Sequence, residues 1–95
     1  MCLSTYNTDY QLLLSVLKTA RKRMGVSQVD LAERLGNTQT FVSKCERGER
    51  RIDAVELVEF AEALGVPSIE LLSEYLEQRS RQGRLPRVRK TKRSR

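Results

Sequence analysis

Apolar residues recur at helical spacing through most of this 95-residue chain and divide it into five segments. Residues three or four apart lie on one face of a helix, so each segment predicts a helix with one buried side. The predicted fold class is therefore all-α. The first predicted helix follows Asp9, which can cap it, and the second runs from Ser27 to Leu35. The third covers residues 38–47. The fourth runs from Ala54 to Leu64, with Asp53 as its cap and Gly65 at its end, and the fifth begins at Pro67.

One stripe on each of the first four helices supplies the candidate core. In the first helix the stripe comprises Leu13, Leu17, Ala20 and Met24, flanked by Leu12 and Val16. In the next three helices it comprises Leu31, Ala32 and Leu35, then Val42 and Cys45, then Leu57, Val58, Ala61 and Leu64. Phe60 fits either the core or a subunit contact. These residues can fill a small core without a metal or a disulfide framework.

The second and third predicted helices are joined by only two or three residues. Ser27 can cap the second helix, because its side-chain oxygen can accept amide hydrogens of the first turn. Gly36 can end that helix in a left-handed conformation, and Thr38 can cap the next one. So short a connection predicts that the third helix crosses the second steeply, as in a helix-turn-helix.

The outer face of the third helix has side chains suited to the major groove of DNA. Glutamine and lysine read adenine and guanine edges, and a phenylalanine can rest on a thymine methyl group. We therefore assign base reading to Gln39, Thr40, Phe41 and Lys44. Contacts with the DNA backbone are assigned to Gln28, at a helix N-terminus, and to Ser43, Arg47, Arg50 and Arg51.

Residues 21–72 contain three motifs, SQVDLAERLG, NTQTFVSKCERGERR and LVEFAEALGV. With these motifs the chain resembles the DNA-binding domain of the phage repressor and Cro family, also called the Xre type. The resemblance implies a compact domain of five helices that binds operator DNA, usually as a homodimer, with the third helix in the major groove. It also implies an ion pair between Arg21 and Glu46 that holds the reading helix. Gln28, by the same resemblance, touches the DNA backbone and braces Gln39.

The charges are unevenly distributed along the chain. Residues 1–17 carry −1, residues 18–52 carry +5, residues 53–78 carry −7 and residues 79–95 carry +9. A protein that binds a polyanion through one face is expected to place its acids elsewhere. We divide the chain into an N-terminal arm at 1–8, a helix-turn-helix domain at 9–78 and a disordered basic tail at 79–95. The tail would attract DNA phosphates, and also RNA, a membrane surface or an acidic protein.

Other functional classes lack the residues they need. The chain has no histidine and two cysteines, so we expect no metal site and no cofactor. Cys45, on an inner helix face, is interpreted as a buried, inert thiol. No catalytic constellation is present, so the protein is predicted not to be an enzyme. There is no run of about 18 apolar residues and no signal peptide, so we expect no membrane span and a cytoplasmic location.

The fifth helix has apolar residues on more than one face. One face can complete the core, while Leu71, Tyr75 and Leu76 are assigned to a contact with a second copy of the chain. Two-fold dimers are the commonest assembly and match paired DNA half-sites. The alternative is that this helix wraps around the core of one chain.

The sequence is interpreted as that of a DNA-binding transcriptional regulator, most simply a repressor, that binds double-stranded DNA as a homodimer. Two alternatives remain open. One is the antitoxin of a toxin and antitoxin pair, with the acidic helices or a terminal segment holding a basic toxin. The other is a protein-interaction adaptor that keeps the fold but reads no bases.

Overall fold

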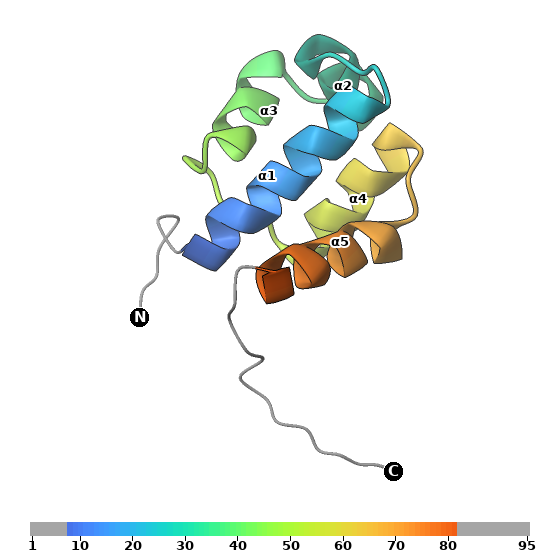
Figure 1. Ribbon diagram of the computed structural model, residues 1–95. Coiled ribbons are helices and arrows are strands. Elements are labelled where there is room, and N and C mark those ends of the chain that lie inside the picture. The colour runs from blue at the N-terminus through green and yellow to red at the C-terminus, as the bar shows by residue number, and fades with distance from the viewer. Residues whose placement is uncertain (1–7, 82–95) are drawn as a thin grey trace.

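The computed structural model describes residues 8–81, which form five helices joined by short turns (Figure 1). The helices are α1 (Thr8–Arg23), α2 (Gln28–Leu35), α3 (Gln39–Glu46), α4 (Ala54–Leu64) and α5 (Ser68–Arg81). The all-α prediction is confirmed. Within these residues no helix is both long and apolar enough to cross a membrane.

Two predicted boundaries shift at the ends of the described region. Thr8, assigned to the arm, is the first residue of α1, and Arg79 to Arg81, assigned to the tail, form the last turn of α5. Arg79 lies 3.5 Å from Asp9, so this turn packs beside the start of α1. Because α1 begins at Thr8, Asp9 is inside this helix and is not its cap. The rest of the arm and tail assignments, residues 1–7 and 82–95, lies outside the described residues.

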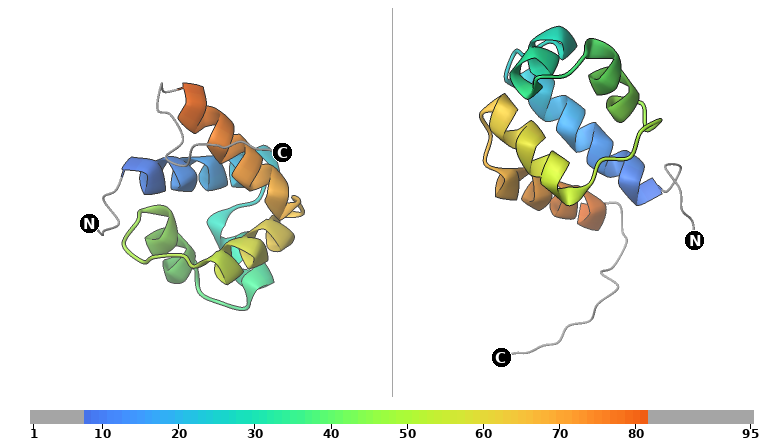
Figure 2. Two further views of the ribbon diagram at one scale, coloured as in Figure 1. Left: turned by 90° about the horizontal axis from the view of Figure 1, so that it is seen from below. Right: turned by 180° about the vertical axis from the view of Figure 1, so that it is seen from behind.

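α1 lies in the middle of the molecule, with α3 on one side and α5 on the other (Figure 2). α2 packs on both α3 and α4, and α4 also contacts α5. This arrangement leaves one flank of α3 at the edge of the molecule. The helix-turn-helix formed by α2 and α3 is thus carried on a support made by α1 and α4.

The helix ends follow from local side-chain chemistry. Ser27, Thr38 and Asp53 each occupy an extended N-cap position and accept a hydrogen bond from the amide three residues later. Such bonds satisfy amides that a helix leaves without partners. Gly36 ends α2 and Gly65 ends α4 with φ values of 70° and 81°, a conformation that costs glycine little. The caps predicted at these positions are confirmed.

The core differs from the predicted one on two helices. Met24 is 45% exposed, because α1 ends at Arg23 and the helical stripe does not continue past it. Val58 is 40% exposed, because Phe60 takes the inward position on α4 and is itself fully buried. Phe60 therefore belongs to the core of one chain. Cys45 is also fully buried, and burial raises the pKa of its thiol, which keeps it protonated at neutral pH.

Two of the three residues assigned to a subunit contact are already covered within the chain. Leu71 is 2% exposed and belongs to the core, and Tyr75 is half-buried against it. Leu76 is exposed, as are its neighbours on α5, Ile69 and Leu72. The assignment of Leu71 to an outward face is thus wrong, because α5 turns that side toward α1 and α4.

Leu31→Ala should lower the free energy of unfolding by about 2–5 kcal/mol, because it removes a fully buried side chain and leaves a cavity. Val55→Ala, at a position on α4 that is 67% exposed, should change it by less than about 0.5 kcal/mol. Urea denaturation followed by circular dichroism measures both values. Equal losses in the two variants would contradict this description of the core.

Candidate nucleic-acid interface

The first turn of α3 is fixed by the turn that precedes it. Thr38 Oγ1 accepts a hydrogen bond from the Phe41 amide at 3.1 Å, and Asn37 Oδ1 accepts one from the Thr38 amide at 2.8 Å. Both bonds connect side chains to backbone within a few residues, so they depend on the local sequence alone. The turn thereby sets where Gln39 and Thr40 begin the exposed face.

A buried ion pair connects the last turn of α3 to α1. Arg21 Nε lies 2.6 Å from Glu46 Oε2, and Arg21 Nη2 donates to Glu46 Oε1 at 3.1 Å. Arg21 Nη1 donates to the Val26 carbonyl at 2.8 Å. The Arg21 and Glu46 side chains are only 9% and 2% exposed. A two-pronged bond between planar groups restricts their relative orientation, so the pair fixes α3 against α1.

Gln28 extends this pair to the start of α3. Its Nε2 donates to Glu46 Oε1 at 2.9 Å, and its Oε1 accepts from Gln39 Nε2 at 2.7 Å. Arg21, Glu46, Gln28 and Gln39 therefore form one chain of side chains, which we call the bracing network. It is anchored in the interior and ends on the exposed first residue of α3. Both ends of α3 are thus tied to the rest of the domain.

The exposed face of α3 carries four polar side chains and no acid. Gln39, Thr40 and Lys44 are exposed and Ser43 is half-buried. Their spacing, two adjacent pairs four residues apart, places them on one face of a helix. α3 itself lies on the side of α1 away from α5 (Figure 2). The exposed face presents amide, hydroxyl and ammonium groups over two turns, a size and chemistry that fit a major groove.

Phe41 does not belong to this exposed face. It is half-buried, with its ring centroid 6.2 Å from that of Phe60. The Arg50 guanidinium lies over the Phe41 ring, 4.8 Å from its centroid. The sequence pattern predicted only Val42 and Cys45 on the inner face of α3. Phe41 also belongs to that face, because Phe60 of α4 packs against it. Glu46, the fourth residue of this inner face, is buried by the ion pair.

The three arginines after α3 each contact a neighbouring side chain. Arg47 lies 2.9 Å from Glu49 and also donates to Ser43 Oγ, and Arg51 lies over the Tyr10 ring at 4.4 Å. The Arg47 and Glu49 side chains are both 54% exposed. An exposed ion pair of this kind contributes little to stability, so a phosphate can replace the carboxylate at small cost.

Arg50 is held more firmly by Glu56, a residue that the sequence pattern did not single out for the site. Its guanidinium lies 2.9 Å from Glu56, and hydrogen bonding to Arg50 lowers the pKa of that carboxyl group below its usual value. Glu56 also accepts from the Asp53 amide at 3.0 Å, while Asp53 accepts from the Glu56 amide at 2.7 Å. The spacing of Asp53 and Glu56 is that of a capping box, and this motif could have identified Glu56 from the sequence.

Comparison with known sequences also indicates a helix-turn-helix domain. The family model described as Helix-turn-helix, HTH_3, matches residues 17–71. A protein of Sinorhizobium fredii (strain NBRC 101917 / NGR234), described as the uncharacterized HTH-type transcriptional regulator y4dJ, is 38% identical over 53 residues. The match covers 56% of this chain and 69% of that protein.

Solved structures share the arrangement of the helices. The XRE-family like protein from Pseudomonas syringae pv. tomato str. DC3000 has a TM-score of 0.72 and 42% identity, over 77% of this chain and 89% of that one. The clp gene regulator ClgR from C. glutamicum has a TM-score of 0.65 and 26% identity, over 72% and 88%. The chain therefore belongs to the Xre-type helix-turn-helix family of DNA-binding transcription regulators, which is not a family of enzymes.

Proposed function

We propose that this regulator binds an operator in double-stranded DNA as a homodimer, with α3 in the major groove, and acts as a repressor by covering the site. The observation that carries the proposal is the acid-free polar face of α3 at the end of the bracing network. A reading helix must present its side chains at fixed positions, because base recognition depends on directional hydrogen bonds. Rigid attachment at both ends of α3 meets that requirement.

Within this proposal Gln39, Thr40 and Lys44 read base edges, while Ser43 and Arg47 meet phosphates beside them. Gln28 contributes through the exposed N-terminus of α2, since its own amide group is engaged by Glu46 and Gln39. Arg50 and Arg51 add positive charge at the edge of the interface. Phe41 we assign to holding α3 against α4, because its ring packs on Phe60.

The contact with a second copy is proposed for the exposed apolar residues of α5, Ile69, Leu72 and Leu76. They replace Leu71 and Tyr75, which pack within the chain. A two-fold dimer places two copies of α3 about one helical turn of DNA apart, roughly 34 Å. Neither the structure nor the descriptions of the relatives point to a toxin, so no toxin partner is proposed.

Selection of bound duplexes from a random DNA pool tests the proposed function. The selected sites should be inverted repeats whose half-site centres lie about 10 base pairs apart. Enrichment of no sequence would favour an adaptor that keeps the fold without reading bases. Selected sites without two-fold symmetry would contradict the homodimer.

Lys44→Ala should weaken binding to the selected site by about 1–3 kcal/mol and leave binding to random DNA nearly unchanged, because a base-reading side chain discriminates between sequences. Gln39→Ala should act in the same direction. The matched control is Arg81→Ala, which removes one exposed positive charge at the far end of α5. Fluorescence anisotropy with both duplexes measures the affinities. Equal losses on the two duplexes for Lys44→Ala would show that Lys44 contacts phosphate.

Arg21→Ala should lower the free energy of unfolding by about 3 kcal/mol, because Glu46 would keep a buried, unpaired charge. Arg23→Ala removes the same charge from an exposed position of α1 and should have little effect. The double variant Arg21→Ala/Glu46→Ala should be less destabilised than the two single variants combined. Additive losses, measured by urea denaturation, would argue against the ion pair.

Deletion of residues 84–95 removes seven positive charges and changes the formal net charge from +6 to −1. Removal of one phosphate contact should flatten the plot of log affinity against log salt by about 0.9, so we expect a change of roughly 2–4 per chain if the tail uses part of its charge. The preferred sequence should stay the same, since contacts with phosphates carry no sequence information. A changed consensus would mean that the tail enters a groove.

A further inference from the structure

A groove of about 280 Å³ lies between α1 and α5. Its base is apolar, because Val16, Ala20 and Leu71 line it and are each no more than 5% exposed. α3 lies on the other side of α1 (Figure 2). The groove is thus separate from the candidate DNA interface, and a second ligand can occupy it while α3 is bound.

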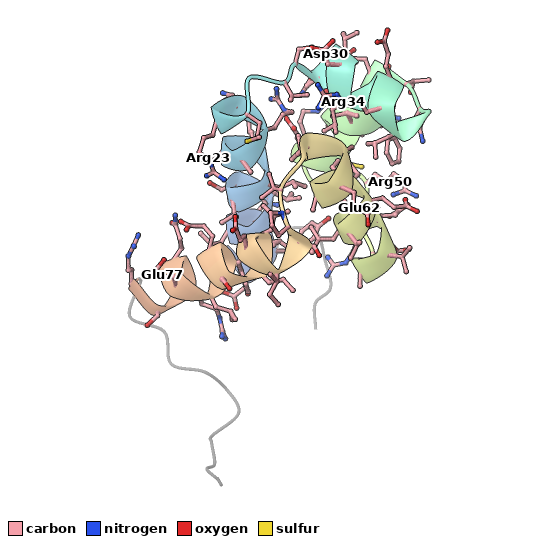
Figure 3. The ribbon with its side chains drawn as sticks, turned by 90° about the vertical axis from the view of Figure 1, so that its right-hand side faces the viewer. Arg23, Asp30, Arg34, Arg50, Glu62 and Glu77 are labelled. Carbon is pink, nitrogen blue, oxygen red and sulfur yellow. The ribbon has the colours of Figure 1, made fainter. Side chains whose placement is uncertain are left out.

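The rim of this groove is acidic. Glu70, Glu74 and Glu77 line it from α5, while Arg23 on α1 is the one base among the described residues that line it, a net charge of −2. Figure 3 shows Arg23 on α1 and Glu77 on α5 on the same side of the molecule. Glu77 lies 3.6 Å from Arg81, and both side chains are at least 60% exposed, so this pair is easily replaced by another cation.

We propose that this groove is a docking surface for residues 84–90 of the same chain. Their sequence, RLPRVRK, has four bases and no acid, with Leu85 and Val88 between the bases. An apolar base with an acidic rim matches a segment in which apolar and basic side chains alternate. The complementarity also extends to total charge, since residues 82–95 carry +7 and residues 8–81 carry −1.

The connection to α5 is long enough for this contact. α5 ends at Arg81, and Glu70 is eleven residues earlier, about 16 Å along the helix axis. Residues 82–89, when extended, span about 26 Å, so the segment can turn back and follow α5 as far as Glu70. Because the segment is tethered to the end of α5, only four residues after Glu77, its effective concentration at the groove is high even if each contact is weak.

Docking gives the basic tail two alternative ligands, the groove and the DNA phosphates. A docked tail contributes less to non-specific attraction, and a DNA duplex, with its dense charge, displaces it. This competition rests on the proposed DNA binding, whereas docking itself does not. The groove would then hold the tail until a DNA duplex displaces it.

A nitroxide spin label attached beside the docking segment tests the proposal without DNA. Thr91→Cys in a Cys2→Ser background supplies the attachment site, and Cys45 stays unlabelled because it is fully buried and its raised pKa keeps the thiol protonated. The amide NMR signals of Ala20, Arg23 and Leu71 should lose intensity, and those of α3 should not. At 1 M salt, where charges are screened beyond about 3 Å, the intensities should return.

Two full-length variants with equal charge change make the test specific. Glu70→Gln/Glu77→Gln removes two acids from the groove rim and should restore the signals. Glu59→Gln/Glu62→Gln removes two exposed acids of α4, outside the groove, and should not. Undiminished groove signals in the labelled parent, or equal effects of the two variants, would overturn the docking. Addition of a random-sequence duplex should also restore the signals, and groove signals that stay weak with DNA bound would overturn the competition.

Discussion

The position of α3 depends on the buried ion pair between Arg21 and Glu46. Removing two charges from water is costly, and the pair is tolerable only because each group finds several hydrogen-bond partners. Glu46 accepts from Arg21 and from Gln28, and Arg21 also binds the Val26 carbonyl. The same bonds that satisfy the charges therefore fix α3 against α1 and α2. One interaction therefore both contributes to the stability of the fold and sets the orientation of the exposed face.

The charge distribution follows from this arrangement of helices. The described residues contain eleven bases and twelve acids, so the folded domain is not a strongly basic body. Its acids concentrate in α4 and α5, where residues 53–78 carry −7, while the exposed face of α3 has none. Attraction of a polyanion by the described residues must then come from a local surface, and residues 82–95 add a charge of +7. The acidic side lies outside the surface that we propose for DNA.

Features that depend on neighbouring residues could be predicted from the sequence. Ser27, Thr38 and Asp53 cap helices because a side-chain oxygen reaches an amide three residues away. The faces of the helices are harder to predict, since which side is buried depends on elements that are distant in the sequence. The pattern points Phe41 and Leu71 outward, yet Phe60 and α1 cover them. The Arg21–Glu46 pair and the Gln28–Gln39 contact were expected only from family resemblance, because nothing local connects these residues. The bond from Gln28 to Glu46, which joins them into one network, was not predicted.

The polar face of α3, held at both ends, is the surface that we expect to meet DNA. The most direct measurement is the set of amide and side-chain NMR shifts that a selected operator duplex produces in the isotope-labelled full-length protein. We expect the largest changes at Gln39, Thr40 and Lys44 and at the start of α2, with small changes along α4. Changes concentrated on α4 and α5, with α3 unaffected, would contradict this assignment of the DNA-binding surface.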